Sequence, residues 1–186
     1  MIDMQEIMSI QNKMNAMESD SLVYDNITSK VIEAYVGDLD RLIQDFNADA
    51  VDSDIDDRTL EKYLLELGNK LYFLSAKLEK IGVKEDVSKL LYKEVYNSSY
   101  LSNREKDSER KNKLTVAELT AIAESESKQE QIVNILYARI YSQIKMRMTA
   151  AYDLINSIRK IITRRMQDKS MSMSIPQGAN LLGMTD

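Results

Sequence analysis

The chain has 186 residues and a net charge of −5, and it contains no cysteine, histidine or tryptophan. Without cysteine there is no thiol nucleophile, disulfide framework or thiolate metal site, and without histidine there is no imidazole base or Ser-His-Asp triad. Hydrophobic residues make up 44% of the chain, which is enough to build a folded core. We therefore expect a binding or structural protein rather than an enzyme, with no cofactor.

Residues 1–56 predict an acidic helical module. Residues 1–60 hold 14 acidic and four basic residues, and the apolar side chains recur at helical spacing over about 3–18 and 28–47. Thr28 or Ser29 is placed to cap the second of these helices. No leader pattern opens the segment, and no apolar window in the chain reaches the ~18 residues of a membrane span. We expect a cytoplasmic protein that does not contact a membrane.

An acidic linker, NADAVDSDIDD, ends this module. Its closely spaced carboxylates invite comparison with an EF-hand loop, which needs a glycine at its sixth position and a carboxylate at its twelfth. A loop that begins at Asp45 has Ala50 in place of the glycine. A loop that begins at Asp52 has Tyr63 in place of the final carboxylate. Both frames fail, so we expect no metal site but a solvated linker, with Asp57 capping the next helix.

A long helical hairpin is predicted over residues 57–168, so the expected fold class is all-α with an acidic helical appendage. Its helices run over about 57–100 and 115–168, and Gly82 interrupts or ends the first apolar stripe. The segment SNREKDSERKNK has no apolar side chain and is typical of a connecting turn. Residues 169–186 show no periodicity and predict a flexible or docking tail.

The final helix is predicted to carry a wide apolar arc and a basic arc opposite to it. A stripe from Val133 to Met166, widened by Tyr152 and Ile161, covers about half of the circumference at ~100° per residue. This arc is wider than one partner helix covers, so we expect a homo-oligomer. The basic arc predicts contact with a polyanion or with an acidic protein face. It carries Arg139, Lys145, Lys160 and Arg164.

Tyrosines alternate with lysines near the end of the first hairpin helix. Rings beside cations are typical of proteins that bind single-stranded nucleic acid, because bases stack on the rings while the cations follow the phosphates. The alternative interpretation is a tyrosine seam that packs against the final helix with its hydroxyls toward water. The residues concerned are Tyr92, Tyr96 and Tyr100 with Lys89 and Lys93.

Residues 57–168 resemble a known family. The segments LGNKLYFLSAKLEKI and LLYKEVYNSSYL, a charged hinge, and the stretch from ELTAIAESESKQEQ to KIITRRM follow one another in an order that resembles the phage recombination mediator UvsY family. The resemblance is a pattern of helices without a strict motif, and residues 1–56 have no counterpart in it. It implies a non-enzymatic protein that assembles into rings and binds single-stranded DNA. It also implies that the protein helps to load a RecA-like recombinase onto strands occupied by a single-strand-binding protein.

The resemblance places the DNA-contacting segment near Lys89 and Lys93, with the charged hinge beside it. The tyrosines and the basic arc of the final helix complete the set of residues that we expect to contact DNA. That set is Lys89, Lys93, Tyr96, Tyr100, Arg104, Arg110, Lys111, Lys113, Arg139, Lys145, Lys160 and Arg164.

Two other functions fit the same sequence. A virion or assembly protein that forms helical oligomers without DNA is suggested by the methionine-rich first helix and the wide apolar arc of the last one. In that case the basic arc meets an acidic face of a neighbouring copy. A helical chaperone or adaptor that docks through its tail segment ANLLGM is a third interpretation.

Overall fold

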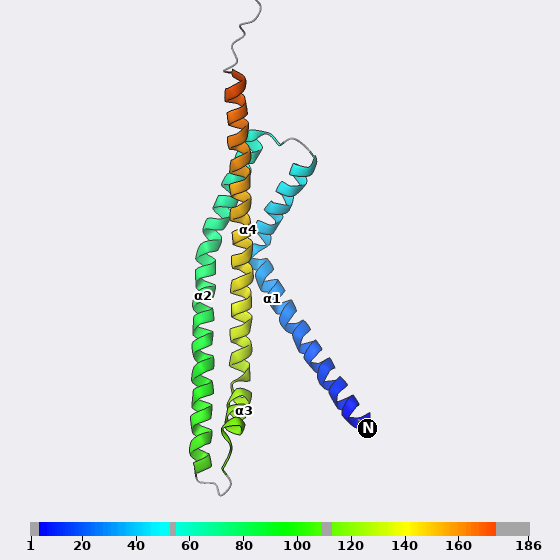
Figure 1. Cartoon of the computed structure of the whole chain (residues 1–186), viewed down its shortest axis with the longest axis vertical. Helices are drawn as coiled ribbons and strands as arrows, with labels where there is room; N and C mark the ends of the chain where they lie inside the picture. The colour runs from blue at the N-terminus through cyan, green and yellow to red at the C-terminus, as the bar shows by residue number, and fades with distance from the viewer. Residues whose placement is uncertain (1–3, 53–54, 109–112, 174–186) are drawn as a thin grey trace, which may run out of the picture. The chain divides into compact units, whose positions relative to one another are not determined.

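The described part of the chain is entirely helical apart from its connections, which confirms the predicted all-α class (Figure 1). The computed structural model describes the backbone of residues 4–52, 55–108 and 113–173, and the side chains of residues 22–50, 55–108 and 113–171. No strand occurs in these ranges. The helices are α1 (Met4–Asp52), α2 (Asp57–Ser108), α3 (Val116–Glu126) and α4 (Lys128–Met173).

The helices form two compact units, and α1, α2 and α4 each contribute a part to both. Unit 1 comprises Met1–Asp38 and Tyr72–Arg147, and unit 2 comprises Leu39–Leu71 and Met148–Asp186. The predicted division after residue 56 coincides with the connection between α1 and α2, whereas the compact units cut across these helices.

The two helices predicted before residue 50 are a single helix, so the expected break between them is wrong. Thr28, expected as a cap, is buried inside α1, and its hydroxyl donates a hydrogen bond of 2.6 Å to the carbonyl oxygen of Tyr24. The polar residues that suggested a break favour turns only weakly, and no glycine or proline supports them there. Burial of Ile32 and Val36 on one helix face outweighs that local preference.

α2 passes through Gly82 without interruption, contrary to the predicted break. A Cβ atom at Gly82 would lie 3.3 Å from a ring carbon of Tyr141, so this glycine permits a close approach of α2 to α4. The expected cap is also displaced by one residue. Asp56, rather than Asp57, accepts 2.9 Å hydrogen bonds from the backbone amide and the hydroxyl of Thr59. These two hydrogen bonds lower the pKa of the Asp56 carboxyl.

The predicted start of the last helical segment near Thr115 is confirmed, but the segment is divided in two. A capping box opens α3: Thr115 Oγ1 accepts from the amide of Glu118 at 3.3 Å, and Glu118 Oε2 accepts from the amide of Thr115 at 2.7 Å. Ser127 separates α3 from α4 and is fully buried, with its hydroxyl donating to the carbonyl of Ala123 at 2.7 Å. Such back-bonding by serine bends helices. α4 ends at Met173, five residues beyond the predicted end at Asp168.

In unit 1, α2 runs antiparallel to α3 and α4. Ser99 contacts Glu126, Ser88 contacts Asn134, and Gly82 lies against Tyr141, so residue numbers fall on one side as they rise on the other. α1 adds a third helix. The apolar core of this unit consists of Ile32, Val36, Leu74, Ile81, Leu119, Ala123, Ile140 and Ile144.

Unit 2 has an apolar core that is bounded by polar contacts. Phe46 and Tyr63 meet edge to face with ring centroids 5.2 Å apart, and the Tyr63 hydroxyl donates to Asp49 Oδ2 at 2.6 Å. That hydrogen bond, together with burial, raises the pKa of Tyr63 to about 12. The core residues are Leu39, Phe46, Leu60, Leu67, Leu71, Met148, Ala151, Ile155 and Ile158.

An ion-pair cluster lies at the start of α2 in unit 2. Asp57 accepts from Lys169 Nζ at 2.7 Å and from an Arg165 guanidinium nitrogen at 3.1 Å. The same nitrogen of Arg165 donates to the carbonyl oxygen of Ile55 at 2.5 Å. The hydrogen bonds from Lys169 and then Arg165 lower the pKa of the Asp57 carboxyl. Asp57, expected to be a helix cap, therefore joins α2 to α4.

Candidate nucleic-acid interface

A shallow concavity of about 490 Å³ lies in unit 1, where α2 ends and α3 begins. Asp107, near the end of α2, is buried, and its Oδ1 accepts a 2.9 Å hydrogen bond from the backbone amide of Leu114. This bond ties the chain that enters α3 to the last turn of α2. The lining residues are Tyr100, Arg104, Asp107, Ser108, Lys113, Leu114, Val116 and Leu119.

Three residues of the expected DNA-binding set line this concavity together. Tyr100 is half-buried and presents part of its ring, whereas Arg104 and Lys113 are exposed. Neither cation forms a salt bridge with another residue whose side chain the structure describes. Asp107 contributes one negative charge, and its Oδ1 is engaged by the Leu114 amide. An aromatic ring that lines the same concavity as two cations can stack on a base while the cations contact phosphates.

The remaining predicted residues of α2 lie outside the concavity. Lys89 and Lys93 are exposed, and Tyr96 is half-buried with its ring centroid 6.3 Å from that of Tyr92. The burial of Tyr92 and Tyr96 fits the alternative interpretation of a packed tyrosine seam. Arg110 and Lys111, predicted from the charged hinge, lie outside the described residues.

The basic arc predicted on the final helix is divided between the two units. In unit 1, Arg139 forms a 2.8 Å ion pair with Asp25 of α1, and the ammonium group of Lys145 lies 5.9 Å from the ring centroid of Tyr141. The carboxylate of Asp25 offsets the charge of Arg139, whereas the neutral ring of Tyr141 leaves the positive charge of Lys145 in place. Lys160 and Arg164 belong to unit 2 and are exposed.

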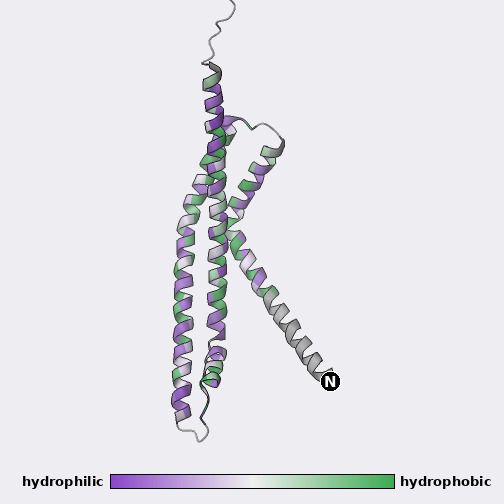
Figure 2. Ribbon diagram, in the orientation of Figure 1, coloured by the Kyte–Doolittle hydropathy of each residue, from purple (hydrophilic) through white to green (hydrophobic). Residues whose placement is uncertain are grey.

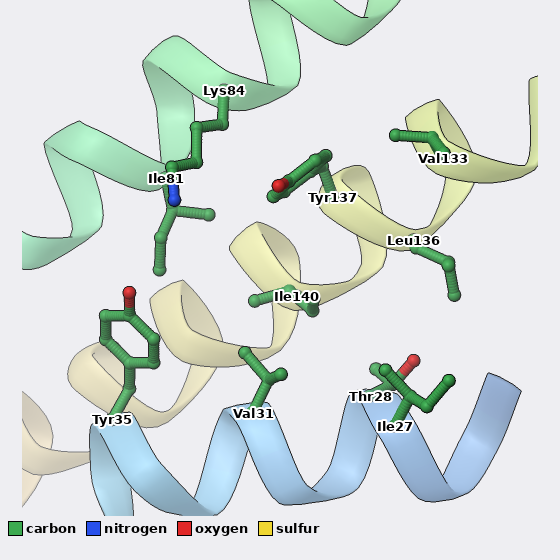
Figure 3. A pocket seen from close by; sticks show the side chains of 10 residues that line it. All are labelled: Ile27, Thr28, Val31, Tyr35, Ile81, Lys84, Val133, Leu136, Tyr137 and Ile140. Carbon is green, nitrogen blue, oxygen red and sulfur yellow. The ribbon is translucent and has the colours of Figure 1, made fainter. Parts of the chain in front are cut away.

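A second cavity, of about 460 Å³, lies between α1, α2 and α4 of unit 1 (Figure 3). Figure 3 shows the Tyr35 ring reaching from α1 toward Ile81 of α2, and Val31 facing Ile140 of α4. The groove is mainly apolar, and Lys84 is its one charged lining residue. The residues that line it are Ile27, Thr28, Val31, Tyr35, Ile81, Lys84, Val133, Leu136, Tyr137 and Ile140.

Several residues that shape these sites were not predicted from the sequence. Asp107, Leu114 and Leu119 position the concavity, but only the capping-box pattern at Thr115 and Glu118 signals where α3 begins. The three-helix groove depends on the packing of α1, for which the sequence has no local signal. Among the described side chains, no group of three or more carboxylates is placed to hold a metal ion.

Comparison of the chain with protein-family models, curated proteins and solved structures finds no match. No helix within the described ranges combines the length and the apolarity that crossing a bilayer requires.

Proposed function

We propose that this chain is a non-enzymatic protein that binds single-stranded DNA at the end of its helical hairpin. The observation that carries the proposal is that Tyr100, Arg104 and Lys113 line one concavity. Arg104 and Lys113 come from opposite sides of the α2–α3 connection, so an open chain would not hold them together. Their juxtaposition depends on the hydrogen bond between Asp107 and Leu114.

The finer proposal is that the chain acts as a recombination mediator in the cytoplasm. It rests on the resemblance of residues 57–168 to the UvsY family. In this role the protein binds single-stranded DNA and helps a RecA-like recombinase to replace a single-strand-binding protein. Addition of the protein is then expected to shorten the lag in recombinase filament assembly on strands that are already covered.

Titration of fluorescently labelled oligonucleotides across a range of salt concentrations tests the DNA proposal. Each phosphate contact contributes about −0.7 to the slope of log affinity against log salt for single strands. The double change Arg104→Ala and Lys113→Ala is therefore expected to flatten the slope by about 1.4. Lys77→Ala, at an exposed lysine elsewhere on α2, is the matched control and leaves the slope unchanged.

The ring of Tyr100 is tested separately from the cations. Tyr100→Ala removes a stacking surface worth about 1–3 kcal/mol per base, whereas Tyr100→Phe keeps the ring and retains affinity. Absence of binding by the wild-type chain even at low salt ends the DNA proposal. If the Arg104/Lys113 double variant binds DNA as the wild type does, the DNA-binding site lies outside the concavity.

A second candidate function, a helical assembly protein, is favoured by a different observation. Large apolar side chains on α2 and α4 are left exposed, among them Tyr72 at 74% and Leu90 at 65%. Exposed apolar surface of this extent marks contact with another protein. Electron microscopy of the purified chain separates the two candidates, because filaments or sheets that form without DNA support assembly.

A further inference from the structure

The part of α2 in unit 1 exposes an apolar face along most of its length. Figure 2 shows apolar residues, in green, recurring among polar ones along this helix. The exposed side chains, which we call the outer face of α2, are Tyr72 (74% exposed), Phe73 (66%), Val83 (58%), Val87 (49%), Leu90 (65%), Leu91 (50%) and Leu101 (55%). A surface of this kind on a soluble helix indicates a partner.

Beyond Ile81, the opposite face of the same helix buries polar side chains where it meets α3 and α4. Ser88 and Ser99 are buried there. The Ser88 hydroxyl lies 3.4 Å from Asn134 Oδ1, and the Ser99 hydroxyl donates to Glu126 Oε2 at 2.5 Å. The usual arrangement of an amphipathic helix, apolar inside and polar outside, is reversed over this stretch. Large apolar side chains of this stretch are therefore left exposed on the outer face.

The outer face is symmetric in sequence about Val87. Val83 and Leu91 lie four residues to either side, and Phe73 and Leu101 lie fourteen to either side. At ~100° per residue all four project within about 40° of Val87. Such a surface repeats itself when the helix direction is reversed, which is the requirement of an isologous two-fold interface.

The charges within this face follow the same symmetry with opposite signs. Lys80 lies seven residues before Val87 and Glu94 seven residues after it, and both are exposed. Each projects within about 20° of the direction of Val87. In an antiparallel pair, each Lys80 comes opposite the partner's Glu94. A parallel pair would instead place Lys80 against Lys80 and Glu94 against Glu94, which is unfavourable.

We propose that the outer face of α2 binds the same face of a second copy of this chain, antiparallel, about a two-fold axis at Val87. From Tyr72 to Leu101 the face is about 44 Å long at a rise of ~1.5 Å per residue. Seven large side chains that are half to three-quarters exposed offer several hundred Å² of apolar surface, approaching the ~800 Å² per partner of a standard interface. The surface differs from the arc on α4 expected to drive self-association, and the proposal does not rest on DNA binding.

Cysteine cross-linking of the full chain tests the axis directly, because the natural sequence has no cysteine. Val87→Cys lies on the axis, and it is expected to form a disulfide-linked dimer under mild oxidation. Leu101→Cys alone is expected to form no cross-link with a short bismaleimide, because the two copies of residue 101 lie about 42 Å apart in the antiparallel pair. A mixture of Phe73→Cys and Leu101→Cys chains is expected to cross-link with the same reagent.

Charge exchange provides a test that does not alter the apolar surface. Lys80→Glu and Glu94→Lys, each made alone, place like charges across the axis twice and are expected to weaken self-association by about tenfold or more. The double variant carrying both changes restores the opposite-charge pairs and is expected to regain wild-type association. Analytical ultracentrifugation measures the dimer dissociation constant, and circular dichroism confirms that each variant is folded.

An apolar-to-charged change completes the test. Leu90→Asp is expected to abolish the dimer, whereas Ile135→Asp, at a 55% exposed apolar position on α4, leaves it intact. Self-linking of Leu101→Cys overturns the antiparallel arrangement. A monomeric wild-type chain, or equal loss in Leu90→Asp and Ile135→Asp, overturns the interface. DNA binding measured in parallel is independent of these results, so the two proposals fail separately.

Discussion

α2 packs against α4 in both units, but the two stretches of the helix bury different chemistry. In unit 2 its inner face is leucine, and Leu60, Leu67 and Leu71 are each at most 2% exposed. In unit 1 the inner face is apolar as far as Ile81 and then becomes polar, with Ser88 and Ser99 buried. The leucines and valines that follow Ile81 point outward instead. Because burial of apolar area dominates stability, the first stretch is organised to hold its own unit together.

The stretch of α2 after Ile81 contributes less to the apolar core. Comparing the two stretches therefore separates effects on stability from effects on binding along one helix. The buried hydrogen bonds of the stretch after Ile81 fix how α2 meets α3 and α4 without adding much apolar burial. Its exposed apolar side chains remain available for contact with another molecule. Substitutions in the two stretches are therefore expected to differ in whether they change unfolding or association.

The largest expected change in the free energy of unfolding comes from the leucine face of α2 in unit 2. Leu67→Ala removes a fully buried side chain from the core of unit 2, and it is expected to lower the free energy of unfolding by about 2–5 kcal/mol. Leu90→Ala, on the outer face, is expected to change it by less than about 0.5 kcal/mol in the monomer. Urea denaturation at low protein concentration measures both. Equal destabilisation by the two variants contradicts the distinction between the stretches.

Charge reversal on α4 tests whether the basic surface of unit 2 contributes to DNA binding in addition to the concavity of unit 1. Lys160→Glu with Arg164→Glu reverses two charges on an exposed surface, and it is expected to weaken binding to single-stranded DNA by about tenfold at low salt. Thermal unfolding should stay the same, because both side chains are exposed. A large drop in the unfolding temperature would instead mean that this surface is buried between copies of the chain.

A smaller effect on stability is expected where the buried serines Ser88 and Ser99 of α2 meet α4 and α3 in unit 1, which we call the polar seam. Ser99→Ala removes the hydroxyl that donates to Glu126, and it is expected to cost about 1 kcal/mol of unfolding free energy. Ser98→Ala is the matched control, because Ser98 is the exposed neighbour on the same helix. If Ser99→Ala proves stabilising, the seam contributes no hydrogen-bond energy.

The ion-pair cluster of unit 2 predicts a pH dependence. The pKa of the Asp57 carboxyl is lowered on folding, so its stabilising effect is fully present above the unfolded value of 3.8 and is lost as the pH falls through the folded value. Asp57→Asn removes this contribution. The stability difference between wild type and Asp57→Asn is therefore expected to be largest near neutral pH and to vanish in acid. Chemical denaturation at several pH values gives this difference, and one that persists at the lowest pH contradicts the assignment.

The smallest expected effect is a change in the ultraviolet titration of the Tyr63 hydroxyl. The hydrogen bond to Asp49 and burial raise the pKa of Tyr63 to about 12, above its ordinary value of 10.0. Ultraviolet titration of phenolate should show a late component that Tyr63→Phe removes and that Asp49→Asn shifts to lower pH. Any stabilisation from this bond is complete below pH 10 and declines between pH 10 and 12, because only the unfolded tyrosine loses its proton there. A late component that survives in Tyr63→Phe assigns it to another tyrosine.

The sequence determined that this protein is built from long helices joined by polar connections. It contains only one proline and five glycines, and periodic apolar residues supplied each helix with a face to bury. The start of α3 was also predictable, because the capping box at Thr115 is a local signal whose hydrogen bonds form within one turn. By contrast, Arg104 was expected in the connecting turn, whereas α2 continues to Ser108 and places Arg104 one turn after Tyr100.

The tertiary structure decided which candidate breaks and which faces were used. Gly82 is a contact with Tyr141 rather than a helix end, and Thr28 is a buried hydroxyl rather than a cap. α2 has apolar residues on two faces, and periodicity alone cannot say which of them meets α4. That choice depends on contacts with residues distant in the sequence, such as Asn134 and Glu126. Local propensities of a few tenths of a kcal/mol per residue are smaller than these burial and hydrogen-bond energies.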